Sequence, residues 1–430
     1  MGHGEGIGNL VAQTIARCAN DHHDIDRIAI ELMPPQSQIP TVMSQSGPFA
    51  VRLALFYSAM FAAFGTQLPF FPVWLKAIGI DAAWIGIINA LPAIARFTTL
   101  PYATSLAERH HAIRGAIIAA AIATAVGFAV VGTQHQPLSL FLAYAVTCVL
   151  WTPTIPLTDA YALRGVVRYG LNYGPLRLWG SAAFALGALV CGFLVDTIAA
   201  RQLIWVIVAL AVIAALVSFL LRPLDDVRRK TAVAGSGKAL MRDPSFLAII
   251  VSAALIQGSH VAYNTFASIS WQAHGLGGLT IAVLWTIGVL AEILVFALSP
   301  RFSLHPSLLM VIGGVGAVVR WVITALEPSV PLLCIVQLGH GLTFALTTVG
   351  TMNLLVQHVP SHQIARGQGY SAAVGGLLSA ATSIASGMIY ARIGEGVYYV
   401  MAAMAGVGAI LIWSARQRLI AHPHSEASGG

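Results

Sequence analysis

Long blocks of apolar residues, separated by short polar stretches, dominate this chain. A helix needs about 20 mostly apolar residues to cross the hydrocarbon core of a membrane, and each block has about that length. The clearest block, residues 203–221, contains no charged side chain. The pattern predicts twelve membrane-spanning helices, over residues 50–72, 82–104, 113–132, 138–158, 174–196, 203–221, 246–269, 280–299, 306–326, 330–353, 367–390 and 396–414.

The longest polar stretch between blocks, residues 223–245, divides the chain into two parts of nearly equal length. Residues 48–222 and 246–418 each hold six predicted spans. Duplicated halves of this kind pack around a central cavity and rock against each other. We therefore expect an all-α integral membrane protein with two pseudo-symmetric six-helix halves, a cytoplasmic linker over 223–245 and a short tail over 419–430.

Residues 1–47 do not follow the apolar pattern. They contain no spanning block and no short apolar core followed by a cleavage site, so a signal peptide is not predicted. We expect a cytoplasmic tail without packed structure. A second interpretation is that translation starts at Met33 or Met43, either of which leaves a shorter tail.

Basic residues predict the orientation of the helices, because cytoplasmic loops carry an excess of Lys and Arg. With the N-terminus inside, 18 of the 23 basic residues fall in inner segments. Three fall outside, at Lys76, Arg201 and Arg392, and two lie within spans, at Arg96 and Arg320. Both chain ends are therefore predicted to be cytoplasmic, in a bacterial-type inner membrane.

The composition agrees with a membrane protein. Hydrophobic residues make up 57% of the chain and charged residues 9%, whereas soluble domains have about 25% charged residues. The net charge is +7, but the basic residues are spread between apolar blocks, so nucleic acid is not a predicted partner. The cysteines have no metal-binding or disulfide spacing, and no metal site is predicted.

Three charged residues lie inside predicted spans, at Arg96, Glu292 and Arg320. Each costs about 2.5–3.5 kcal/mol near the middle of a bilayer on insertion scales. Such residues persist where they line a water-filled cavity or pair with one another, and intramembrane charges usually mark transport pathways. Both interpretations, cavity and pairing, stay open for these three.

Glu292, Arg320 and His340 lie on three successive predicted spans. A permanently charged arginine can neutralise an ionised glutamate and is released when that glutamate takes a proton. This exchange of partners would couple a proton to the binding of an anion. His260 is a weaker candidate, because a single membrane histidine is more often a hydrogen-bonded packing residue.

A second pair of opposite charges, Asp159 and Arg177, lies in the first half. Helix-rise arithmetic places both near the cytoplasmic boundary, where loop charges are common. They are therefore either boundary charges or part of a substrate site. Phe184, two turns after Arg177, is a candidate to flank a ligand.

Several segments resemble those of the major facilitator superfamily, and within it the phenylpropionate permease group, relatives of the lactose permease-like oligosaccharide:proton symporters. The resemblance covers about residues 50–415 and is carried by LPFFPVWLKAIG, PLTDAYAL, YGPLRLWGSAAF, SISWQAHG, VLAEILVFALS, VVRWVITAL and QLGHGLTF. It implies a twelve-helix transporter that works by alternating access.

The resemblance also implies roles for individual residues. Asp159 and Arg177 would hold the substrate and Phe184 would stack on it, and Glu292, Arg320 and His340 would be the proton-coupling residues. Apart from the resemblance, Arg96 is added to the substrate residues as an embedded cation, and His260 to the proton-coupling residues as the weaker candidate. One departure is Thr343, which stands where lactose permease has the glutamate that carries the proton. Either Glu292 or His340 takes over that role, or the coupling differs.

The superfamily's signature loop between the second and third spans reads TSLAERHHAIR here. Glu108 replaces the usual aspartate and Thr104 the usual glycine, while Arg109 and Arg114 keep the basic character. A gating role and a simple contribution to membrane topology are both open for Glu108, Arg109 and Arg114.

We predict a proton-coupled symporter of a small organic solute, with an aromatic carboxylate such as 3-phenylpropionate as the expected substrate. A sugar or nucleoside is the alternative. A non-transporting membrane sensor on the same scaffold is the alternative from another class. The chain has no HExxH or GxSxG motif and is not predicted to be an enzyme. We expect a monomer in a lipid bilayer, with the proton as coupling ion and no cofactor.

Overall fold

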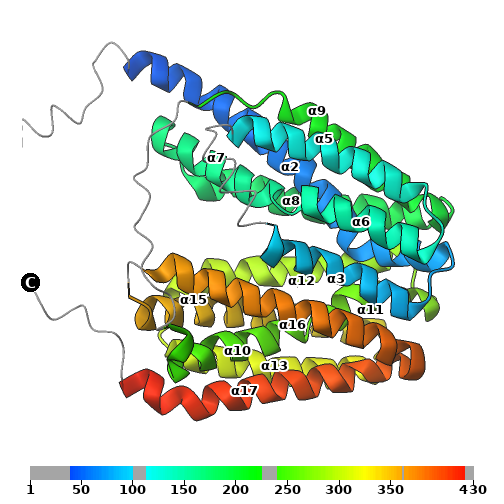
Figure 1. The fold of residues 1–430 in the computed structure, drawn as a ribbon, viewed down its shortest axis with the longest axis vertical. Coiled ribbons are helices and arrows are strands. Elements are labelled where there is room, and N and C mark those ends of the chain that lie inside the picture. The colour runs from blue at the N-terminus through cyan, green and yellow to red at the C-terminus, as the bar shows by residue number, and fades with distance from the viewer. Residues whose placement is uncertain (1–38, 100–112, 225–239, 361–362, 422–430) are drawn as a thin grey trace, which may run out of the picture.

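The computed structural model describes residues 39–99, 113–224, 240–360 and 363–421, and the described residues form a bundle of long helices (Figure 1). The first part of the chain forms α2 (Ile39–Ala77), α3 (Ala82–Thr98), α5 (Ile113–Gly132), α6 (Pro137–Trp151), α7 (Thr154–Tyr169), α8 (Tyr173–Val195) and α9 (Leu203–Ser218). The second part forms α10 (Pro244–Gly258), α11 (Val261–Ala273), α12 (Gly278–Leu298), α13 (Pro306–Ala325), α14 (Val330–His340), α15 (Leu346–His358), α16 (Ile364–Ile393) and α17 (Val397–Ala421).

Ten segments of the described residues are long and apolar enough to cross a membrane. One of them, Arg366–Ala421, contains both α16 and α17, which the short turn η6 (Gly394–Gly396) separates. A further apolar helix, α3, is shorter, with 17 residues. The all-α membrane architecture predicted from the sequence is therefore confirmed, and the count of twelve spans stays a prediction.

Three predicted spans are interrupted in the structure. The fourth breaks after Trp151 and resumes at Thr154, then runs to Tyr169, beyond the predicted end at residue 158. Pro153 directly precedes α7, where its missing N–H costs nothing. The seventh breaks between α10 and α11 at Ser259–His260, and the tenth contains a π-helical turn, η4 (Gly341–Ala345).

The outer surface of the bundle is apolar, as expected for contact with lipid. Large apolar side chains point outward along most helices; examples are Val167, 84% exposed, and Ile410, 70% exposed. A soluble monomer rarely exposes so much contiguous apolar surface. Buried polar groups meet inside the bundle instead, where helices can satisfy their hydrogen bonds.

The helices α2 and α5–α9 lie together, and α10–α17 lie beside them, with α3 between the two groups in Figure 1. The start of α2 and the end of α17 lie at the same end of the bundle, which we call the terminal end. The opposite end, the distal end, holds the connections at 274–277, 326–329 and 394–396. Residues 1–38, most of 223–245 and 422–430 lie outside the described residues, so the predicted tails, linker and domain limits stay predictions. Residues 39–47, predicted as tail, belong to α2.

Two close glycine contacts join the groups near the distal end. A Cβ on Gly86 of α3 would lie 2.8 Å from the Cα of Gly387 on α16. A Cβ on Gly192 of α8 would lie 2.6 Å from the carbonyl oxygen of Gly278 on α12. Any larger residue would push these backbones apart, because such approaches are possible only where no side chain intervenes.

Asp196 adds a polar contact between the same groups. Its carboxylate, directly after α8, accepts hydrogen bonds from the backbone N–H groups of Gly278 at 2.6 Å and Leu279 at 3.1 Å. These N–H groups are among the unpaired donors at the start of α12, and an aspartate is a favourable residue to satisfy them. A residue of the first group therefore caps a helix of the second.

Candidate functional site

A first polar cluster lies within α2, α7 and α8 and is centred on Asp159. Its Oδ1 accepts hydrogen bonds from the hydroxyls of Tyr57 at 2.6 Å and Tyr173 at 2.9 Å. Tyr57 is fully buried, whereas the side chain of Asp159 is 32% exposed. Two hydroxyl donors hold the carboxylate in place and leave part of it open to a ligand or water.

Arg177 completes this cluster. Its Nε lies 4.0 Å from Asp159 Oδ1, within ion-pair distance. The guanidinium lies over the ring of Phe61, with Cζ 4.0 Å from the ring centre, and is 30% exposed. A cation held over an aromatic face keeps most of its five N–H donors available. The structure thus brings Asp159 and Arg177 together.

The other two predicted substrate residues make no hydrogen bond or ion pair with Asp159 or Arg177 within the described part of the chain. Phe184 is half-buried and packs against the apolar cluster that contains Tyr57 and Phe61. Arg96 lies on α3 with an exposed side chain, and no ion pair joins it to any described residue. Their predicted contacts with substrate stay predictions.

A second polar cluster lies among α12, α13 and α14, around the buried Arg320. Its Nη2 donates to Gln337 Oε1 at 3.0 Å, its Nε to the Val336 carbonyl at 3.2 Å, and its Nη1 to His340 Nδ1 at 3.0 Å. The guanidinium also lies 4.7 Å from the ring centre of Tyr263. Arg320 is therefore held from several sides without a carboxylate in direct contact.

The contact with Arg320 determines the tautomer of His340. A guanidinium only donates hydrogen bonds, so Nδ1 of His340 accepts and the ring proton sits on Nε2. That nitrogen lies 3.6 Å from Glu292 Oε2. The expected direct pair of Glu292 and Arg320 is not what the structure contains, because the imidazole lies between the two charges.

His260 joins the second cluster through Thr343. Its Nδ1 lies 3.1 Å from the Ile256 carbonyl, which can only accept, so Nε2 accepts from the Thr343 hydroxyl at 3.0 Å. The same hydroxyl lies 3.5 Å from Arg320 Nη1. Thr343 belongs to η4, and π-helical turns within α-helices often occur at functional sites.

Four residues of these clusters were not predicted from the sequence: Tyr57, Tyr173, Tyr263 and Gln337. The sequence did contain a signal for Gln337, because an amide side chain within an apolar span needs a hydrogen-bond partner. In the structure Gln337 is 1% exposed. The tyrosines had no such signal, because tyrosine is common in membrane helices and their partners are distant in sequence.

The predicted gating loop is only partly described. Glu108 and Arg109 lie outside the described residues. Arg114 donates from Nε to the Leu221 carbonyl at 2.5 Å and from Nη2 to the Phe219 carbonyl at 3.3 Å. It thus satisfies carbonyls that follow α9, which stabilises a helix end.

Comparison with known proteins decides the family. Residues 50–401 match the model of the "MFS_1 like family". The chain belongs to this family. Family membership identifies it as a major facilitator superfamily transporter and a multi-pass membrane protein, and not as an enzyme.

Curated relatives of this family member are transport proteins. The chain is 32% identical over 362 residues to a probable 3-phenylpropionic acid transporter of Escherichia coli (strain K12), covering 82% of this chain and 94% of that protein. It is 28% identical over 379 residues to a maltose permease of Geobacillus stearothermophilus, covering 85% and 94%.

Solved structures of the superfamily share the fold. A mutant of the nucleoside transporter NupG matches with a TM-score of 0.78 at 17% identity, over 85% of this chain and 99% of that chain. An auto inhibited POT family peptide transporter matches with a TM-score of 0.68 at 12% identity, over 89% and 98%. The resemblance predicted from the sequence segments is confirmed at the level of family and fold.

Proposed function

We propose that this transporter is a proton-coupled symporter of small aromatic carboxylates, of which 3-phenylpropionate is the model. The observation that carries the coupling is the line of side chains Glu292, His340 and Arg320. In this arrangement a proton can bind Glu292 while Arg320 stays positive, and His340 can take one only at Nδ1, where its hydrogen bond from Arg320 would be released. Glu292 is 26% exposed and His340 14%, so neither side chain is sealed inside the bundle.

The substrate class rests on the first cluster. Arg177 presents a partly exposed guanidinium over the rings of Phe61 and Tyr57, and the ring of Phe64 packs against Phe61 with a centre-to-centre distance of 5.8 Å. A guanidinium matches a carboxylate through two parallel hydrogen bonds, and neighbouring rings suit an aromatic tail. The relative from Escherichia coli, named a probable 3-phenylpropionic acid transporter, supports the same class.

In this proposal the protein lies in an inner membrane with both ends cytoplasmic and works by alternating access. The distal end then faces outward, and the glycine contacts Gly86–Gly387 and Gly192–Gly278 close it. Both clusters belong to one chain, so a monomer suffices. The proton is the coupling ion, and no other cofactor is required.

A sugar or nucleoside is the second candidate substrate. The maltose permease is a relative at 28% identity. Asp159 also suits a hydroxylated solute, because a carboxylate accepts hydrogen bonds from hydroxyl groups, as it does from Tyr57 and Tyr173.

Uptake into proteoliposomes tests both proposals. With an inward proton gradient, labelled 3-phenylpropionate should accumulate above the external concentration, and an uncoupler should abolish that excess. Maltose and uridine serve as parallel substrates. Accumulation of either in place of 3-phenylpropionate would favour the second candidate. Binding without any uptake would indicate a sensor, and uptake insensitive to the uncoupler would contradict symport.

A further inference from the structure

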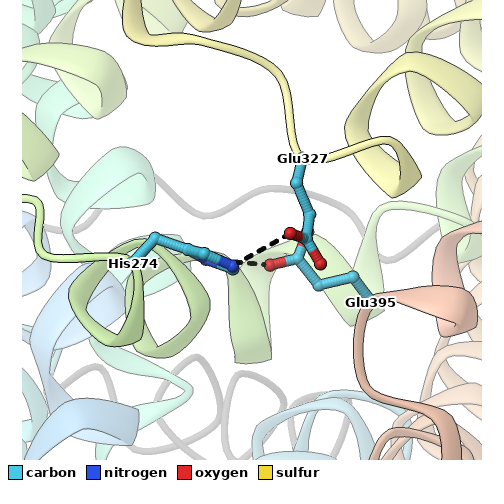
Figure 2. Close-up of side chains that lie close together, drawn as sticks. All are labelled: His274, Glu327 and Glu395. Carbon is cyan, nitrogen blue, oxygen red and sulfur yellow. Dashed lines mark ion pairs between the residues drawn. The ribbon is translucent and has the colours of Figure 1, made fainter.

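Three side chains from separate connections meet at the distal end, away from both polar clusters (Figure 2). His274 follows α11, Glu327 lies between α13 and α14, and Glu395 belongs to η6 between α16 and α17. One ligand atom from each lies within 4.8 Å of the others. No metal site was predicted from the sequence, where only the cysteines were considered and these three residues lie far apart along the chain.

The spacing suits a metal ion. His274 Nε2 lies 3.2 Å from Glu327 Oε2. Two ligands that each lie about 2.1 Å from an ion at a tetrahedral angle are about 3.4 Å apart. Glu395 Oε1 lies 3.3 Å from the other ring nitrogen, Nδ1, and Figure 2 shows the carboxylate of Glu395 next to that of Glu327.

The imidazole is oriented to use Nε2 as a ligand. Its Nδ1 lies 2.9 Å from the Ser270 carbonyl oxygen, which can only accept, so the proton is on Nδ1. In the neutral ring Nε2 then presents a lone pair toward Glu327. Metal-binding histidines commonly donate their other N–H to a carbonyl in this way.

Ser270 also orients a second ligand, since its hydroxyl donates to Glu395 Oε1 and leaves Oε2 available. Ser270 is 2% exposed and lies on α11, one turn before His274. One buried residue therefore supports both His274 and Glu395. Outer support of this kind accompanies metal ligands in known sites.

A further polar group beside the cluster has no partner. The hydroxyl of Tyr398 is buried, interacts electrostatically with Glu395, and makes no hydrogen bond to any described residue.

Glu327 is the one described non-glycine residue with positive φ, at 52°. It is also 57% exposed, so the open side of the cluster can admit water ligands.

We propose that His274, Glu327 and Glu395 bind a divalent transition-metal ion of the zinc class. One neutral imidazole and two carboxylates match the charge and ligand preferences of such ions. The ion would tie together the distal ends of α11, α13 and α16. This goes beyond the transport function and does not depend on the substrate.

Zinc binding to the purified full-length protein, freed of metal and of any histidine tag, tests the proposal. Calorimetric titration should detect one zinc ion per chain, and zinc should raise the unfolding temperature by a few degrees, whereas equal magnesium should not. His274→Gln and Glu327→Gln should each weaken zinc affinity at least tenfold. Ser270→Ala, which removes a positioning residue, should weaken it by about tenfold.

The control is His135→Gln, which replaces an exposed distal histidine outside the cluster and should leave affinity unchanged. Glu327 is exposed, so Glu327→Gln should fold normally. A loss of zinc affinity in this variant therefore cannot be attributed to misfolding. The proposal fails if no zinc binds at micromolar concentration, if magnesium stabilises equally, or if the His274 variant binds as tightly as the parent. Any of these results would mean that His274 only forms hydrogen-bonded ion pairs with the two glutamates and that the cluster binds no metal.

Discussion

Nη1 of Arg320 donates to Nδ1 of His340 across 3.0 Å, and this one hydrogen bond directs the imidazole proton toward Glu292. The cation therefore acts on the acid through an intermediate ring. A proton added to this unit can bind Glu292 without disturbing the contacts that hold Arg320, whereas protonation of His340 at Nδ1 would break its hydrogen bond from Arg320. The three residues form a unit in which a change at one end should reach the other.

Replacing Glu292 by glutamine should abolish uphill accumulation while leaving equilibrative exchange. Glutamine keeps the shape and hydrogen-bonding capacity of glutamate but cannot bind and release a proton. Proteoliposomes measure both quantities, with net accumulation under a proton gradient and counterflow without one. Counterflow at the parental rate serves as the internal control for folding and binding. Normal accumulation by the variant would remove Glu292 from the coupling step.

Replacing Arg177 by alanine should weaken substrate binding about 10–100-fold. A hydrogen bond to a charged group contributes about 1.5–3 kcal/mol, which corresponds to that range. Arg177→Lys should be intermediate, since lysine keeps the charge but loses the planar fork. Calorimetry with 3-phenylpropionate measures the affinity.

The matched control for Arg177→Ala is Arg418→Ala, which removes an exposed arginine near the end of α17. It should bind like the parent. If the Arg177 and Arg418 variants bind 3-phenylpropionate with equal affinity, Arg177 is a charge at the membrane boundary and not a substrate-binding residue.

Replacing Asp196 by alanine should loosen the distal end. Loss of an N-cap costs about 0.5–2 kcal/mol, and this cap joins the two helix groups. Spin labels at positions 134 and 272, on opposite groups, should report a longer or broader distance distribution. Asp196→Asn keeps an acceptor and should resemble the parent. An unchanged distribution in the alanine variant would show that this cap is not needed to hold the two groups together.

His305 should make the protein less stable in acid. Its neutral ring caps α13 by accepting from the Ser307 N–H at 3.3 Å. Partial burial lowers the pKa of His305, and repulsion from His358 and Arg416 lowers that pKa further. Because the folded pKa lies below the unfolded value of about 6.5, the contribution is present above pH 6.5 and is lost as pH falls through the folded pKa.

Thermal unfolding at pH 7.5 and pH 5 measures this effect. His305→Asn is the comparator, since asparagine caps a helix at either pH. The unfolding temperature of the parent should drop more between the two pH values than that of the variant. Parallel drops would exclude a role for His305 in the acid sensitivity.

The helical fold was predictable because apolar length alone specifies a span. The predicted block 113–132 coincides with α5, and 306–326 differs from α13 by one residue. The breaks at His260 and η4 were not predictable, because they depend on contacts between helices. His260, for example, is held by Thr343, 83 residues away.

The residues of the candidate site also fall into two classes, those predictable from local sequence and those that depend on contacts between helices. Glu292, Arg320 and His340 stood out because a charge in hydrocarbon is costly wherever it occurs. Tyr57 and Tyr173 did not, because their importance arises only where α2, α7 and α8 pack together around Asp159. Their roles become visible only from the packing of these helices.

The π-helical turn Gly341–Ala345 changes which side chains of the following helix, α15, face the inside of the bundle. A π-turn accommodates one residue more than an α-turn, and each residue of an α-helix rotates the chain by about 100°. A helical wheel drawn through Val330–His358 as one regular helix therefore assigns α15 the wrong inward face. Deleting a single residue here would rotate α15 about its own axis by about 100° relative to α13. The side chains that now face α13 would then point elsewhere.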